Sequence, residues 1–187
     1  MISFPTEDRT FAFNLKTKHW CEWADFNQNS SQMTRFKMNC YVNIPDWNLQ
    51  LIGDRTTGKI YSISVENDDD AGEYIKNIIR TNVIDYGIST KKRSNRISLS
   101  FKRGKGKTDE INTLDTNADP HFLIRWKDND KDWSNYHKIS AGKISEFRRQ
   151  VHLRGMGIFI NRVYEISCTD KIPFILYDAE EDIEALQ

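Results

Sequence analysis

The stretch Gly106-Lys-Thr108 has the residue types that end a phosphate-binding P-loop. A P-loop also needs a glycine five positions before its second glycine, where this chain has Phe101, and it needs a helix after the loop. The sequence offers neither feature. We therefore interpret the stretch as a flexible basic loop, with nucleotide binding as the disfavoured alternative.

The aspartates of Lys127-Asp-Asn-Asp-Lys-Asp132 alternate in the manner of a calcium-binding loop. Such a loop has a glycine at its sixth position and closes with a glutamate at its twelfth. Those two places hold Trp133 and Ile139. We expect a polar hairpin tip here, because the turn and the closing ligand are both missing.

Histidines and cysteines are the other side chains that could bind a metal or act as nucleophiles. The histidines fall on separate predicted strands, and none forms a pair or joins a cysteine; they are His19, His121, His137 and His152. The cysteines are odd in number and far apart, which favours free buried thiols over a disulfide framework; they are Cys21, Cys40 and Cys168. We predict no catalytic, cofactor-binding or metal-binding residue, and no enzyme.

Charge is concentrated in two segments although the 27 basic and 27 acidic side chains cancel. One segment carries eight cations and no acid, namely Lys91, Lys92, Arg93, Arg96, Lys102, Arg103, Lys105 and Lys107. These residues are candidates for contact with a DNA backbone or a protein partner, and a solvated strand edge with a loop is the favoured alternative. The other segment, 178–184, is acidic, and it is either a solvated tail or a complementary patch for a second copy.

Short runs with alternating apolar and polar residues fill the chain and predict an all-β fold. The clearest runs lie at 9–15, 19–23, 40–44, 48–52, 59–65, 95–101, 121–126 and 162–168, and a further strand is predicted at 146–151. Residues 75–84 suit a strand or a short helix, and their β-branched side chains favour the strand. Residues 102–119 have almost no apolar side chain and are predicted to form a long loop.

The pattern divides into two parts. Residues 1–82 are predicted to form blade-like antiparallel hairpins, and residues 83–187 a β-sandwich-like domain with an acidic C-terminal tail. A propeller needs at least about four blades, and the first part has the length for two at most. No signal peptide is evident after Met1, so we expect synthesis in the cytoplasm.

The last third of the chain resembles the C-terminal part of the packaged-DNA stabilisation and tail-hub proteins of short-tailed bacteriophages. The resemblance lies in Trp126 followed by an aspartate-rich tip and Trp133-Ser, and it continues through Ile139-Ser-Ala-Gly142, 147–157 and 161–170. The opening hairpin and the segment 53–61 are similar to blade-like repeats before that part. The chain departs from the pattern at residues 129–131, where a glycine-rich tip is usual, and at Met156-Gly157. It also begins where such proteins would be midway, which leaves open a fragment or a shortened relative.

The resemblance implies a structural protein of the virion, made in the host cytoplasm. It would form part of a homo-oligomeric ring around the DNA exit channel in the tail or head-to-tail connector. Its partners would be the portal or connector and other tail proteins, with non-specific contact to packaged DNA. The alternative is a carbohydrate-binding β-sandwich in which exposed Trp126 and Trp133 stack on sugars, and a glycoside hydrolase is the least favoured reading.

Overall fold

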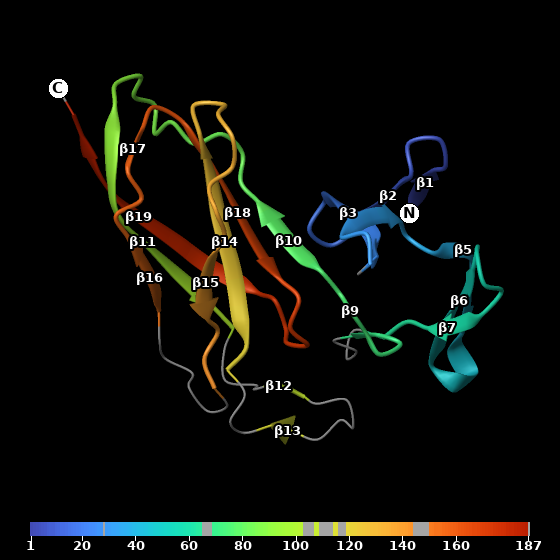
Figure 1. Ribbon diagram of the computed structural model, residues 1–187. Coiled ribbons are helices and arrows are strands. Elements are labelled where there is room, and N and C mark those ends of the chain that lie inside the picture. The colour runs from blue at the N-terminus through green and yellow to red at the C-terminus, as the bar shows by residue number, and fades with distance from the viewer. Residues whose placement is uncertain are drawn as a thin grey trace. The chain divides into compact units, whose positions relative to one another are not determined.

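A computed structural model describes residues 1–27, 29–64, 69–102, 107–108, 114–115, 119–143 and 150–186 (Figure 1). Antiparallel strands make up this part of the chain, with a single turn of 3₁₀ helix, η1 (Pro45–Trp47), as its one helical element. The all-β prediction is therefore confirmed. None of the described helices is long and apolar enough to cross a membrane.

The chain divides into two compact units, residues 1–75 and 76–187. The predicted boundary was residue 82. The strand β10 (Asn77–Arg80) lies between these positions, and it belongs to unit 2 because it pairs with β18 (Arg162–Cys168). Its presence also confirms the strand that was favoured over a helix in this stretch.

Unit 1 is built from small antiparallel sheets. Its first sheet has the order β1-β2-β3-β4, with β1 (Ile2–Phe4), β2 (Arg9–Asn14), β3 (His19–Asn27) and β4 (Gln32–Arg35). Its second sheet has the order β5-β6-β7, with β5 (Met38–Ile44), β6 (Leu49–Asp54) and β7 (Ile60–Ser62). A two-stranded hairpin follows, β8 (Asp69–Asp70) with β9 (Glu73–Tyr74).

Side chains that bind the backbone fix the turns of these sheets. Asn14 Oδ1 accepts hydrogen bonds from the amides of Lys16 and Thr17, and the chain reverses through Lys18 at φ 60°. Asp54 holds the next turn in the same way, by accepting from the Thr56 amide and the Thr57 hydroxyl. Gly58 completes that turn at φ 70°, where a residue without a Cβ is favoured.

Unit 2 contains two four-stranded groups. One sheet has the order β10-β18-β14-β15, with β14 (His121–Asp128) and β15 (His137–Ser140). The other is centred on β11 (Lys92–Phe101), which pairs with β16 (Val151–Arg154), β17 (Ile158–Phe159) and β19 (Leu176–Ala185). The long strands of unit 2 in Figure 1 are β11, β14, β18 and β19.

The hydrophobic core of unit 2 joins its two sheets, as in a sandwich. Leu99 of β11, Ile124 of β14 and Ile166 of β18 belong to one buried cluster. Within it, the rings of Phe101 and Phe122 stack with their centroids 4.1 Å apart. Burial of these side chains is the main source of stability for the unit.

Unit 1 has no comparable core. Its buried residues, among those described, are Thr10 and Ile52, while its sheets leave many large apolar side chains exposed. A sheet of three or four short strands needs an apolar face buried against another layer to be stable. Unit 2 therefore buries its apolar side chains in a core of its own, whereas unit 1 leaves many of them exposed.

Two expectations about segments are corrected. The acidic segment 178–184 is not a tail but most of β19, which pairs with β11 over nine residue positions. Within the predicted loop 102–119, β12 (Lys107–Thr108) pairs with β13 (Leu114–Asp115). The predicted strand 146–151 lies outside the described residues except for its last two positions, of which Val151 begins β16.

None of the three cysteines forms a disulfide, as predicted, but only one of them is buried. Cys168 lies in the core of unit 2, whereas Cys21 and Cys40 are exposed. The two exposed thiols lie on sheets of unit 1, whose faces are left uncovered. The expectation of three buried thiols is therefore wrong for these two.

We predict that an alkylating reagent labels Cys21 and Cys40 in the native protein and labels Cys168 only after unfolding. The reason is that a reagent reaches an exposed thiolate directly but reaches a buried one only when its unit opens. Peptide mass spectrometry after native and denaturing alkylation measures the difference. Equal native labelling of all three cysteines would contradict the burial of Cys168.

Candidate functional site

The cationic residues predicted for partner contact are distributed along β11 and the segment after it. Lys91 and Arg96 are exposed, and Lys102 is partly buried. Lys92 has no exposed surface, and its Nζ donates to the carbonyls of Ile88 and Thr90. Arg103 and Lys105 lie outside the described residues, as does the side chain of Lys107 in β12.

The acidic strand β19 lies along this basic strand. Arg93 stands opposite Glu184 and forms an ion pair with it at 3.3 Å, and Arg96 stands opposite Asp182. Farther along, Glu180 and Asp178 face serines of β11. The part of the basic run that lies on β11 and the acidic run on β19 are thus neighbours in one sheet, and their fields partly cancel.

On the core side of the same sheet, Glu181 of β19 accepts from hydroxyl groups. It receives hydrogen bonds from Tyr86 and Tyr164, each at 2.6 Å, and from Ser94. Burial and the nearby carboxylate together raise the pKa of both tyrosines well above the ordinary phenol range. The two phenols therefore stay protonated and remain donors at neutral pH.

Arg162 of β18 lies beside this carboxylate and has no exposed surface. Its Nε and Nη2 atoms donate to the two carboxylate oxygens of Asp128, at 2.6 and 2.8 Å. Nη2 also donates to the Met156 carbonyl at 2.6 Å, and Nη1 lies 3.6 Å from a Glu181 oxygen. Burial alone lowers the pKa of Arg162, but its bonds to Asp128 and Tyr164 outweigh that effect and raise it.

The predicted hairpin tip after β14 is held by this arrangement. Asp128 is occupied by Arg162, and Asn129 Oδ1 accepts from the amides of Ile160 and Asn161. Asn129 and Asp130 both adopt positive φ, at 53° and 59°, which closes the turn without the usual glycines. Asp128 and Asp130 each pair with a cation of this region, Arg162 and Lys127.

A second buried carboxylate, Glu165, organises the outer face of β18. It accepts from Arg80, from Arg125 at 2.7 Å and from the Tyr136 hydroxyl at 3.1 Å. Burial alone would raise the pKa of Glu165, but the hydrogen bonds and charges of the two arginines lower it. The side chain of Glu165 is therefore an anion held inside a cationic cluster.

The two tryptophans of the carbohydrate alternative are engaged within unit 2. Both are partly buried. The Trp126 ring stacks on His137 at 4.8 Å, and the guanidinium of Arg125 lies 4.6 Å from the centre of the Trp133 ring. The two rings are therefore less exposed than expected, and carbohydrate binding stays a prediction.

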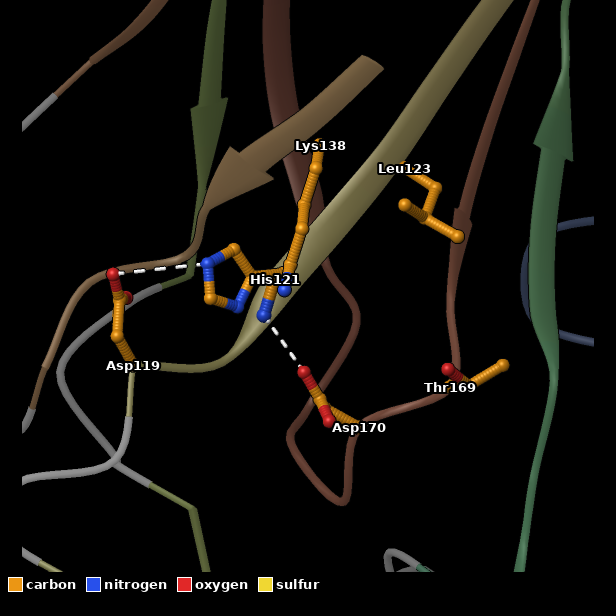
Figure 2. A pocket seen from close by; sticks show the side chains of 6 residues that line it. All are labelled: Asp119, His121, Leu123, Lys138, Thr169 and Asp170. Carbon is orange, nitrogen blue, oxygen red and sulfur yellow. Dashed lines mark hydrogen bonds and ion pairs between the residues drawn. The ribbon is translucent and has the colours of Figure 1, made fainter. Parts of the chain in front are cut away.

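One pocket of about 380 Å³ lies at the start of β14. Figure 2 shows His121 between Asp119 and Asp170, with Leu123, Lys138 and Thr169 completing the lining. The His121 ring lies 3.9 Å from Asp119, and its backbone amide donates to Asp170 at 2.7 Å. The Ser140 hydroxyl donates to Asp119 at 2.5 Å.

The lining of this pocket combines acids with a histidine, and nucleophilic catalysis would need in addition a base in contact with an attacking hydroxyl or thiol. Among the described residues, no three His, Cys, Asp or Glu side chains are placed to hold a metal ion. The histidines do lie on four separate strands, β3, β14, β15 and β16, as predicted. Gly106 and the side chains of Lys107 and Thr108 lie outside the described residues. The interpretation of this stretch as a basic loop rather than a P-loop therefore stays a prediction.

Unit 1 has one cluster of titratable groups. Asp25 of β3 is near Lys37, which forms an ion pair with Asp70 at 2.5 Å, and near Arg55. Burial raises the pKa of Asp25 to about 6, and Asp70 adds to the rise, while Lys37 and Arg55 oppose it. The cluster links the first sheet to β8 and to the segments flanking the second sheet.

The sequence patterns did not single out Arg162 or Glu165, and they included Glu181 only as one member of the acidic segment 178–184. Arg162 and Glu165 are the two charged residues of the mostly apolar strand β18. The available signal was a charged residue at an inward position of a predicted strand, since such a residue needs a partner. That signal identifies the residue but not its partner.

We predict that Arg162→Met lowers the free energy of unfolding of unit 2 by about 3–5 kcal/mol, because it leaves Asp128 and Glu181 as unpaired anions. The matched control is Arg93→Met, which removes an exposed pair and is expected to cost about 1 kcal/mol or less. Urea unfolding followed by circular dichroism measures both. Equal losses would show that Arg162 is not central to the unit.

We also predict that Asp25→Asn removes a pH dependence of unit 1. The folded-state pKa of about 6 lies above the unfolded value of about 3.9, so the parent loses stability as pH rises through 6. At pH 8 the variant should be more stable by on the order of 1 kcal/mol. Thermal unfolding monitored by tryptophan fluorescence at pH 5 and 8 tests this, with Asp46→Asn as a control that should keep the parent's behaviour.

Comparison with known proteins adds no family. No model of a known protein family matches the sequence, and no curated protein matches it. The resemblance to phage tail-hub proteins therefore depends on the residues named above. It enters the functional argument as a proposal.

Proposed function

We propose that this protein is a structural subunit of a bacteriophage tail or head-to-tail connector. It forms part of a ring around the DNA exit channel and binds neighbouring tail proteins. The observation that carries the proposal is the contrast between a well-packed unit 2 and a unit 1 whose apolar sheets are uncovered. Large exposed apolar surfaces of this kind mark sites where another protein binds.

The residues of the resemblance act as structural clamps, which supports a structural function. Ser134 closes the tip after β14 because its hydroxyl accepts from the Trp126 amide at 3.0 Å and its own amide donates to the Trp126 carbonyl at 2.8 Å. Asp170 binds the start of β14 through the His121 amide. These groups hold strands together.

The basic residues are proposed to contact packaged DNA or an acidic neighbour within the assembly. The acids of β19 beside β11 weaken the field of this surface, so we propose no independent high-affinity DNA site. A backbone contact of this kind carries no base specificity and weakens as salt displaces it. The proposal therefore predicts a contact that depends on assembly and on ionic strength.

We predict that deleting the gene from its phage yields particles that fail to retain DNA, and that the protein is found in purified virions by mass spectrometry. A variant in which Lys102, Arg103, Lys105 and Lys107 become Gln should fold but retain DNA less well as salt is raised. The charge-matched control replaces four exposed lysines away from β11, namely Lys16, Lys18, Lys131 and Lys138. Virions that lack the protein would overturn the proposed function.

If the variant retains DNA as well as the parent at low and moderate salt, the proposed contact between the basic residues and packaged DNA is wrong. The proposed structural function is not affected by that result. The two readouts are therefore independent. Presence in the virion tests the structural function, and salt-dependent retention tests the DNA contact.

A further inference from the structure

Two arginines of unit 2 meet on the outer face of the sheet that contains β10, β18 and β14 (Figure 1). The strand register places Arg80, Glu165 and Arg125 in one row across these three strands. Glu165 lies between Tyr164 and Ile166, which both belong to the core cluster, so the row points to the side away from the core. The row therefore holds two cations and one anion on the outer side of the sheet.

Glu165 binds the same edge of each guanidinium. Its Oε2 atom accepts from Nε and Nη2 of Arg80, and its Oε1 atom accepts from Nε of Arg125 at 2.7 Å and lies 2.7 Å from Nη2 of Arg125. An arginine has five N–H donors, and the two on Nη1 are not used in these bonds. In the part of the chain that the structure describes, no acceptor is bonded to Nη1 of either arginine. Both Nη1 groups are therefore available to a further acceptor.

Aromatic side chains hold the two guanidiniums in place. The Arg125 guanidinium lies 4.6 Å from the centre of the Trp133 ring and 4.5 Å from that of the Tyr136 ring. The Arg80 guanidinium lies 5.3 Å from the centre of the same Trp133 ring. An arginine stacked on an aromatic ring loses less freedom when it binds a ligand, because its plane is already oriented. The donors of the row are therefore preorganised.

The row carries more positive charge than its carboxylate neutralises. Glu165 is buried and stays ionised, because the two arginines lower its pKa. One glutamate stands against two arginines, and 56% of the Arg80 side chain is exposed. Lys127 shares this side of β14, and it is paired with Asp130 at 3.7 Å. One excess positive charge therefore remains at an accessible place.

The acids of the pocket at the start of β14 do not neutralise this excess. Asp119 and Asp170 lie beside His121, at the first position of β14. Arg125 is four positions farther along the strand, which corresponds to about 13 Å. Exposed charges at that separation are largely screened at physiological ionic strength. The excess charge therefore needs an anion from outside the described structure for close compensation.

We propose that Arg80 and Arg125 form a binding site for a phosphate oxyanion, and that Glu165 positions both guanidiniums for it. A tetrahedral phosphate presents acceptor oxygens in several directions and can bridge two guanidiniums, whereas a planar carboxylate matches the fork of a single arginine. The negative charge of the phosphate compensates the excess cation. The backbone of a nucleic acid and free inorganic phosphate share this chemistry.

This phosphate site is distinct from the basic residues along β11. The strand β11 belongs to the other sheet of unit 2, and its cations lie beside the acids of β19. The phosphate site also needs neither a ring nor a virion. It goes beyond the proposed function, and the purified chain is sufficient to test it.

The test compares Arg80→Gln with the matched control Arg9→Gln in the full chain. The two arginine side chains are similarly exposed, 56% and 52%, and each is paired with a glutamate. Arg80→Gln removes the excess cation and leaves Arg125 paired with the buried Glu165, so the fold is expected to persist. Sodium phosphate is titrated at pH 7 and constant ionic strength, and the side-chain Nε–H resonances of the arginines are followed by NMR.

We predict that phosphate shifts the Nε–H resonances of Arg80 and Arg125 in a saturable manner, in the parent and in Arg9→Gln alike. Arg80→Gln should bind phosphate about tenfold more weakly, because a charge-assisted hydrogen bond is lost. Arg80→Lys keeps the charge without the fork and should fall between the two. Circular dichroism and urea unfolding check the fold of every variant.

Titrations with a short oligothymidylate and with sodium acetate identify the source of the anion. An oligomer that binds the parent more tightly than Arg80→Gln indicates a nucleic-acid backbone, and a difference with inorganic phosphate alone indicates free phosphate.

Two results would overturn the phosphate site. One is a parent without saturable shifts, or with the same affinity for phosphate as Arg80→Gln. The other is acetate that binds at these resonances as tightly as phosphate, which would identify a protein carboxylate as the ligand. Neither result bears on whether the protein is found in virions, so the proposed function is tested separately.

Discussion

The guanidinium of Arg162 is the charge around which unit 2 is arranged. It has no exposed surface, so its charge has lost its water and depends on the protein for compensation. Asp128 at the end of β14, Glu181 of β19 and the Met156 carbonyl supply it. These groups come from both sheets and from the connection before β17, so one buried cation fixes how the layers of the sandwich align.

The pairing of β11 with β19 extends this arrangement to the surface. A carboxylate at position 181 points to the core and meets Arg162, while its neighbours Glu180 and Asp182 point outward beside β11. Alternation along a single strand thus serves two purposes. The inward carboxylate of Glu181 pairs with the buried Arg162. The outward acids give β19 a charged surface that disfavours pairing with other sheets.

Unit 1 has well-defined turns and strands but exposes many of its apolar side chains. Its turns are well specified by Asn14, Asp54 and Gly58, and its strands are in register, but the apolar residues of its sheets have no layer over them. The turn residues and the strand pairing of unit 1 are therefore in place, but the apolar side chains of its described sheets are not buried. The proposed binding of a neighbouring protein would supply the missing layer.

The sequence alone determined what depends on local period and turn chemistry. Strands such as 9–14, 121–128 and 162–168, the polar tip after Asp128 and the extended state of 77–80 all follow from alternation, β-branching and turn residues. Tertiary structure decided what depends on pairing between distant segments. It joined the basic and acidic runs in one sheet, buried Lys92 and Arg162, covered Trp126 and Trp133, and exposed Cys21 and Cys40. The physical reason is that a period shows that a strand has two faces, whereas only the neighbouring strands and layers decide which residues of those faces meet a partner, the core or water.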